Sequence, residues 1–156
     1  MVESKEYRAA LGRFASGVTV VTTRDAAGTA HGLTVSAFSS LSLDPPLVLV
    51  CIDKRAASHS AFTESRAYVV NLLADTQEHL SKQFSSKAPD RFAGVGHTPG
   101  IGGVPVLDGA LASIECTLAA AHDAGDHTIY VGAVEKVTVR DAAPLLYFSG
   151  RYARIT

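Results

Sequence analysis

Alternation of apolar and polar residues recurs along the chain and predicts a mainly β protein. Residues 112–118 carry Ala, Ile, Cys and Leu at every second position, with Ser, Glu and Thr between them, as a strand with one buried face requires. Residues 128–139 supply its antiparallel partner. Residues 18–23 are all β-branched, and residues 29–41 return beside them after the turn residues 25–28, which predicts a second hairpin.

Three more segments bring the expected number of strands to about seven. Residues 47–52 are continuously apolar and follow the break Asp-Pro-Pro, which predicts a central strand buried on both faces. Residues 67–73 and 145–148 predict two further strands. Strands and helices do not alternate regularly, so a closed or nearly closed antiparallel barrel is favoured over a doubly wound sheet.

Helices are expected to be few and short. Tyr7, Leu11 and Phe14 are spaced i, i+4 and i+7, which predicts an amphipathic opening helix that ends near Gly17. A second helix is expected over residues 56–63. A third opens at Asp75, where Glu78 three residues later completes a capping-box pattern.

Residues 88–109 lose this periodicity. They contain three prolines and six glycines, which predicts an ordered excursion or lid outside the barrel. The glycines at 94, 96 and 100 miss the dinucleotide-binding fingerprint by one residue and follow no strand, so no Rossmann domain is expected.

Length and composition narrow the class of protein. The 156 residues, 47% of them apolar, predict a single domain over residues 1–156. A net charge of −1 provides no field to concentrate nucleic acid or anionic lipid, so neither partner is expected. No apolar run is long enough to cross a membrane and the N-terminus lacks a signal core, so the expected location is cytoplasmic.

Hydroxyl side chains gather in residues 34–40, Thr-Val-Ser-Ala-Phe-Ser-Ser. In one continuous strand, Thr34, Ser36, Phe38 and Ser40 share a face and Ser39 lies opposite. A polar, uncharged face fits a flat heteroaromatic ring such as isoalloxazine, which needs hydrogen-bond donors and an apolar wall. A solvent-facing edge strand explains the same residues equally well.

A phosphate site is suggested where residues 53–59, Asp-Lys-Arg-Ala-Ala-Ser-His, follow the apolar strand. A helix start favours an anion, and Lys54, Arg55 and Ser58 would add charge-assisted hydrogen bonds. The alternative is a solvated charged turn.

Gly125, Asp126 and His127 join the two alternating strands at a barrel rim. His127 would cover a bound nicotinamide or donate to a reacting ring, with Asp126 fixing its tautomer, or the tripeptide is ordinary hairpin chemistry. A metal site formed with His122 lacks a further ligand motif, so no metal is expected.

These segments together resemble the flavin reductase-like family, which has an FMN-binding split barrel, and notably the small reductase components of two-component flavin-dependent monooxygenases. The resemblance covers nearly the whole chain. It rests on residues 14–22, 32–48, 125–127 and 144–152 in that order.

The resemblance implies a mainly β, antiparallel split β-barrel with a few short helices. It implies an NAD(P)H:flavin oxidoreductase that passes hydride from NADH or NADPH to FMN or FAD, forms a homodimer and supplies reduced flavin to a monooxygenase. His127 and Asp126 are the catalytic candidates. The cofactor-binding candidates are Thr34, Val35, Ser36, Ser39, Ser40, Cys51, Ile52, Asp53, Lys54, Arg55, Ser58, Phe84, Ser85, Lys87, Gly125, His127, Tyr147 and Arg151.

One departure from the family pattern bears on flavin affinity. Many relatives read Thr-Ala-Asn-Ser-Phe where residues 34–38 read Thr-Val-Ser-Ala-Phe, so Ser36 replaces a longer amide and Ala37 lacks a hydroxyl. Two other functions stay open: a flavin-binding electron-transfer or storage module without reductase turnover, and an oxidase or haem-related split barrel with a different ligand.

Overall fold

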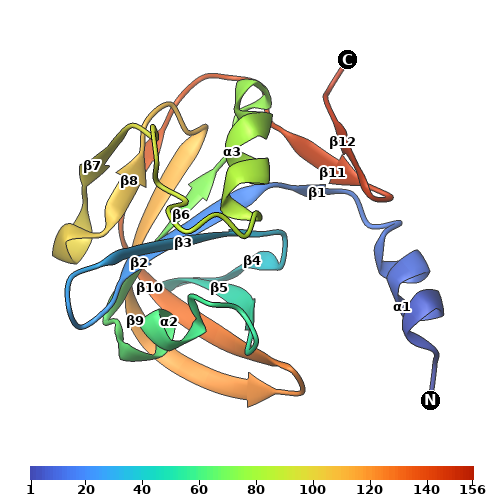
Figure 1. Cartoon of the computed structure of the whole chain (residues 1–156), viewed down its shortest axis with the longest axis horizontal. Coiled ribbons are helices and arrows are strands. Elements are labelled where there is room, and N and C mark those ends of the chain that lie inside the picture. The colour runs from blue at the N-terminus through green and yellow to red at the C-terminus, as the bar shows by residue number, and fades with distance from the viewer.

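The main sheet of the computed structural model, which describes residues 1–156, contains seven strands in the order β3-β2-β6-β9-β10-β5-β4 (Figure 1). Every neighbouring pair is antiparallel. The mainly β, antiparallel architecture expected from the periodicity is therefore confirmed. The strands are β2 (Thr19–Arg24), β3 (Ala30–Val35), β4 (Phe38–Leu43), β5 (Pro46–Asp53), β6 (Ala67–Leu72), β9 (Ala112–Ala124) and β10 (His127–Val139).

The chain itself joins the two edges of this sheet. Strands β3 and β4 are consecutive in sequence but lie at opposite edges, and only Ser36 and Ala37 connect them. The Cys51 N–H donates to the Ala37 carbonyl at 3.0 Å, which fixes this corner against β5. The prediction of one strand over residues 29–41 was wrong, because the segment passes from one edge strand of the sheet to the other. The place where these two edges meet is here called the barrel seam.

Two core clusters lie on the two faces of the central strands. The first contains Val21, Val50, Tyr68 and Tyr130, and the second contains Val20, Phe84 and Leu145, among others. The strands buried along most of their length are thus β2 and β6.

The prediction that residues 47–52 form a central strand buried on both faces was wrong. In β5 only Val48, Val50 and Ile52 are buried, and the alternate residues are half-buried. The strand lies next to edge strand β4 and not at the centre of the sheet.

The opening helix α1 (Ser4–Leu11) ends earlier than expected, because Gly12 and not Gly17 is its C-cap. The helix has no buried residue and stands clear of the barrel in Figure 1. Tyr7, Leu11 and Phe14 are exposed by 58%, 53% and 80%. Their apolar spacing therefore does not mark a contact with the core of this chain.

Of the other two predicted helices, one begins later than expected and one opens at Asp75 as expected. Helix α2 (His59–Glu64) follows a turn over residues 56–58. A short helical turn η1 (Asp75–Gln77) precedes α3 (Glu78–Phe84). The capping contact is made by Gln77, whose Oε1 accepts the Ala74 N–H at 2.9 Å, and not by Glu78.

The ordered excursion predicted for residues 88–109 is confirmed. It contains β7 (His97–Pro99), η2 (Ile101–Gly103) and β8 (Pro105–Leu107), which form a separate two-stranded sheet. A third sheet joins β1 (Ser16–Gly17), β11 (Leu146–Phe148) and β12 (Arg151–Ala153). None of the helices has the length and hydropathy that a membrane-spanning helix requires.

Candidate functional site

A cavity of about 190 Å³, here called the seam cavity, opens where β3 ends at the barrel seam. Its polar lining consists entirely of hydroxyl groups, and no charged side chain lines it. The lining residues are Val18, Thr34, Ser36, Ser81, Ser85, Tyr147 and Tyr152. The structure thus brings four predicted cofactor-binding residues together, from β3, the end of α3 and β11.

Hydrogen bonds order the wall of the seam cavity. Thr34 Oγ1 donates to the Ser81 carbonyl at 2.7 Å, and Ser81 Oγ lies 2.7 Å from the Tyr152 hydroxyl. The Tyr147 and Tyr152 rings have centroids 5.2 Å apart. A surface of fixed hydroxyls beside aromatic rings fits the polar edge and flat face of an isoalloxazine ring.

A larger cavity of about 580 Å³, here called the loop cavity, lies at the other end of β3. Predicted residues Ser58 and Lys87 both line it. Its lining is Thr29, Ala30, His31, Gly32, Ala57, Ser58, Lys87, Ala88, Pro89, Asp90, Arg91 and Phe92. Ser85 of the seam cavity and Lys87 are two residues apart after α3, so the two cavities flank the same chain segment.

The Gly125-Asp126-His127 turn packs against the segment that follows β5. His127 pairs with Asp53 in the β5–β10 ladder, and the Lys54 N–H donates to the Asp126 carbonyl at 2.9 Å. Gly125 has φ +60°, a left-handed conformation that favours glycine. His127 Nδ1 lies 2.7 Å from Asp126 Oδ1, and the His127 side chain is 40% exposed.

The outer face of β5 connects this turn to the seam cavity. Cys51 and Asp53 point to the same face, because side chains alternate along a strand. Asp53 is opposite His127, and Cys51 is bonded through its N–H to Ala37, the neighbour of Ser36. A hydroxyl-lined cavity and a His–Asp pair therefore lie along one continuous edge of the barrel.

Lys54 and Arg55 are each paired with an aspartate. Arg55 donates to Asp53 through its backbone N–H, Nε and Nη2 at 2.8, 3.2 and 2.9 Å, and the ion pair lowers the pKa of Asp53 to about 2. Lys54 Nζ lies 3.8 Å from Asp123 Oδ1. Neither cation lines the loop cavity, where the Lys and Arg side chains are Lys87 and Arg91.

The His127 hydrogen bond lowers the pKa of Asp126, which keeps this exposed carboxyl ionised. A carboxylate only accepts hydrogen bonds, so the His127 nitrogen that faces Asp126 carries the proton. The other ring nitrogen, Nε2, is then available for a ligand. Burial raises the pKa of the Cys51 thiol, so this cysteine is a poor nucleophile.

Several predicted contacts lie outside both cavities. The side chains of Val35, Ile52 and Phe84 are core residues, exposed by 6%, 1% and 0%. Phe84 packs edge to face on Phe92 at 5.0 Å between ring centroids, so its side chain belongs to the core, and its approach to the cofactor stays a prediction. Arg151 is exposed on β12.

The expected hydroxyl face of Thr34, Ser36, Phe38 and Ser40 was also wrong. Because β3 ends at Val35 and β4 begins at Phe38, the alternation breaks between them. Ser39 and Ser40 are exposed on the edge strand, and Ser39 Oγ donates to the Ser40 carbonyl at 2.8 Å.

Sequence reasoning missed Ser81, Tyr152 and Arg91. Ser81 precedes Ser85 by four residues on α3, a spacing that places both on one helix face. Tyr152 lies in segment 144–152, one of the four on which the family resemblance rests, but was given no role. Arg91 is bonded to the Gly32 and Ser86 carbonyls, and no local pattern signals these bonds.

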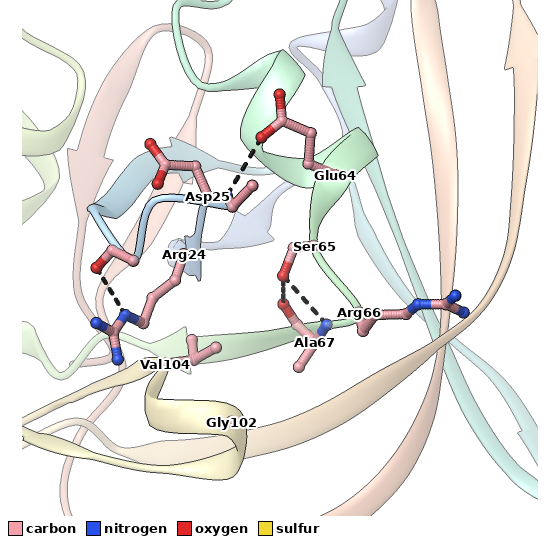
Figure 2. A pocket seen from close by; sticks show the side chains of 10 residues that line it. Arg24, Asp25, Glu64, Ser65, Arg66, Ala67, Gly102 and Val104 are labelled. Carbon is pink, nitrogen blue, oxygen red and sulfur yellow. Dashed lines mark hydrogen bonds between the residues drawn. The ribbon is translucent and has the colours of Figure 1, made fainter.

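A further cavity of about 380 Å³ lies beside the Arg24 turn and contains none of the predicted site residues (Figure 2). Arg24 Nε donates to the Gly28 carbonyl at 2.8 Å, and Glu64 Oε2 accepts the Ala26 N–H at 3.3 Å. Arg66 points away from Arg24 in Figure 2. No three His, Cys, Asp or Glu side chains of the chain are grouped as metal ligands would be.

Comparison with known proteins agrees with this site. The family model described as "Flavin reductase like domain" matches residues 11–156. The chain is 46% identical over 149 residues to an NADH-dependent flavin reductase of a Rhodococcus species, covering 93% of this chain and 82% of that protein. It is 40% identical over 155 residues to HsaB, the reductase subunit of a flavin-dependent monooxygenase of Rhodococcus jostii, covering 99% and 79%.

A solved structure is similarly close. The NADH:FAD oxidoreductase SgcE6 of Streptomyces globisporus, in complex with NAD and FAD fragments, superimposes with a TM-score of 0.93 at 34% identity, covering 100% of this chain and 96% of that one. Sequence, fold and the hydroxyl-lined seam agree, and the chain belongs to the flavin reductase-like family.

Proposed function

We propose that this protein is an NAD(P)H-dependent flavin reductase, an oxidoreductase that moves hydride from a reduced nicotinamide to a flavin. The observation that carries this function is the continuous edge from the seam cavity to the Asp126–His127 pair. It offers an uncharged hydroxyl surface for the flavin and a partly exposed imidazole for the nicotinamide.

The residues present fit a flavin. Thr34, Ser36 and Ser85 would hydrogen-bond the ring from the seam cavity, with Tyr147 against its face. Ser58 and Lys87 would hold a phosphate in the loop cavity. FMN and FAD both supply the same hydride-accepting ring and a phosphate.

The role proposed for His127 is to bind the nicotinamide. With the Nδ1 proton donated to Asp126, His127 Nε2 accepts a hydrogen bond, for example from a carboxamide N–H. Gly125 allows the tight turn that presents this nitrogen at the rim.

Hydride transfer needs no acid–base triad, so the chain contributes positioning. A bound flavin would supply the ring that accepts the two electrons and the proton of the hydride, and a reduced nicotinamide would be the donor. Holding donor and acceptor in a reactive geometry is worth up to about 7–11 kcal/mol in well-oriented systems. The ordered hydroxyls of Thr34 and Ser81 suit this role, because they do not reorganise when the reaction occurs.

NADH is the donor that we propose, since two of the relatives carry NADH in their names. The acceptor of the reduced flavin is a flavin-dependent monooxygenase, as for the reductase subunit HsaB. The cytoplasm, where NADH is available, is the proposed location.

We also propose a homodimer. Helix α1 buries nothing in its own chain, and its apolar side chains continue into exposed Phe14. Leu41 and Leu43 on edge strand β4 are exposed by 49% and 92%. A second copy that covered these residues would remove large apolar side chains from water.

Steady-state oxidation of NADH and of NADPH by the purified protein, with FMN, FAD or no flavin, tests the function. We expect flavin-dependent oxidation well above the protein-free rate and a higher kcat/KM with NADH. Tight flavin binding without nicotinamide oxidation would contradict the reductase and would favour a flavin-binding module.

A further inference from the structure

A chain of hydrogen bonds crosses the mouth of the barrel, on the opposite side of β10 from His127. His59 Nε2 lies 2.9 Å from Thr128 Oγ1, and Thr128 Oγ1 donates to Asp123 Oδ1 at 3.2 Å. The Tyr130 hydroxyl lies 3.4 Å from His59 Nε2 and 2.9 Å from Thr63 Oγ1. These groups line a cavity of about 440 Å³ that contains none of the seam or loop cavity residues.

The chemistry of the acceptors sets the direction of these bonds. Asp123 is a carboxylate that only accepts, so the Thr128 hydroxyl proton points to it. Thr128 Oγ1 must then accept from His59, so His59 carries its proton on Nε2. The Thr63 hydroxyl lies 3.3 Å from the His59 carbonyl, which leaves Tyr130 free to donate to Thr63. Each donor then has an acceptor, and the Tyr130 oxygen is a second, longer acceptor for the His59 Nε2–H.

The central bond joins residues that are adjacent in sequence to both halves of the proposed site. His59 follows Ser58 of the loop cavity directly, and Thr128 follows His127 directly. Side chains alternate across a strand, so Thr128 points into the barrel while His127 points out. A bond between His59 and Thr128 therefore fixes one half-site against the other without occupying either.

We propose that His59 is a positioning residue of the reductase. Through Thr128 and Asp123 it holds the His127 turn in a fixed position relative to Ser58, which lines the loop cavity. This inference rests on the proposed function of His127. Thr128 is 4% exposed and its hydroxyl also donates to Asp123, so loss of the His59 donor removes one of the two hydrogen bonds that hold this hydroxyl. The ion pair of Lys54 with Asp123 lies at the Asp123 end of this series of hydrogen bonds.

Five single variants separate positioning from simple stability. His59→Phe keeps a planar ring without a donor, His59→Gln restores an N–H donor, and Thr128→Val removes the acceptor at constant shape. Thr63→Val is the matched control, because it removes a hydroxyl from the same cavity but not from the bond between His59 and Thr128. His79→Phe, at an exposed position of α3, controls for loss of a histidine.

We expect His59→Phe and Thr128→Val to raise the KM for NADH about fivefold, as the net loss of one hydrogen bond allows. Thr63→Val should have the same thermal midpoint, and the same flavin Kd measured by fluorescence, as His59→Phe and Thr128→Val. The KM of Thr63→Val for NADH, however, should equal that of the unmodified protein. His59→Gln should recover most of the loss. An equal rise of KM in Thr63→Val, or an unchanged KM in His59→Phe with only a lower thermal midpoint, would overturn the inference.

A double-mutant cycle tests whether His59 acts through the His127 turn. If it does, adding His59→Phe to His127→Ala raises the KM no further, whereas independent roles give multiplied effects. If the two substitutions multiply their effects on the KM in a protein that still turns over, the inference about His59 is overturned and the proposed function stands. Absence of turnover in the unmodified protein would instead contradict the proposed function.

Discussion

His127 is the residue whose neighbours most restrict its chemistry. Its Nδ1 faces Asp126 at 2.7 Å, its backbone pairs with Asp53, and its side chain is partly open to solvent. Asp126 therefore sets the tautomer, and Nε2 is the nitrogen that a ligand meets.

Replacing His127 by Ala should raise the KM for NADH about tenfold, because one hydrogen bond from an oriented imidazole is lost. The flavin Kd should change little, since the seam and loop cavities do not include His127. Steady-state kinetics and flavin fluorescence titration measure the two quantities. His122→Ala, at an exposed position of the same hairpin, is the control, and an unchanged KM in His127→Ala would contradict the role.

Asp53 makes the other charged contact at this rim. Bonds from Arg55 lower its pKa to about 2, below the ordinary value of ~3.9 for the unfolded chain. A carboxyl whose pKa is lowered on folding stabilises the protein above the unfolded value, and this contribution is lost as the pH falls from ~4 through about 2.

Arg55→Ala should therefore raise the pKa of Asp53 toward its ordinary range, and acid unfolding should begin at a higher pH. A carboxyl NMR titration measures the pKa directly. Arg140→Ala is the control, because that guanidinium donates to the Gly109 carbonyl instead. An Asp53 pKa that does not move in Arg55→Ala would show that Arg55 is not its main partner.

At the scale of elements, most strands follow from local periodicity. Residues 112–118 and 128–139 alternate so regularly that β9 and β10 were predicted directly, and Asp25 to Gly28 marked the β2–β3 turn. Where a strand turns a corner, the pattern fails. Residues 34–40 keep a strand-like composition although the chain crosses the barrel seam between Val35 and Phe38.

Burial depends on what covers an element, and a single chain's periodicity does not reveal this. Residues 47–52 are apolar throughout, yet Leu47, Leu49 and Cys51 are only half-buried. The apolar face of α1 likewise has no partner in its own chain. In both places apolar side chains stay uncovered by the rest of the chain, as they would at an interface with a second copy.

The site was predicted in parts. Thr34, Ser36, Ser85 and Tyr147 meet at the seam cavity, and Ser58 meets Lys87 at the loop cavity. The pairing of Lys54 and Arg55 with aspartates was not predicted, because it depends on how β5 ends against the 125–127 turn. The burial of Phe84 was not predicted, since helix phase decides which side of α3 faces the core.

The segment after α3 gives an element-scale prediction. Lys87→Ala should raise the Kd of FMN about tenfold, as expected for one charge-assisted hydrogen bond, and leave that of riboflavin unchanged. Lys136→Ala is the control, because Lys136 lies on β10 and pairs with Glu115 of β9. Equal weakening of FMN and riboflavin would mean that Lys87 does not contact the phosphate.

For the whole molecule, the exposed apolar residues point to association. Sedimentation velocity should give twice the mass of the chain for the unmodified protein and a larger monomer fraction for Phe14→Asp. Val139→Asp, at a residue 77% exposed near the end of β10, tests whether any added charge has this effect. A monomer at all concentrations would contradict the homodimer.

The fold supports one central claim, that the barrel edge from the seam cavity to His127 brings a nicotinamide and a flavin together for direct hydride transfer. Anaerobic stopped-flow absorbance with FMN or FAD and NADH deuterated at the transferred position tests it most directly. We predict rapid loss of the oxidised-flavin band and a severalfold slower phase with the deuterated donor. Flavin that binds but keeps its oxidised spectrum with both NADH and NADPH would contradict the account.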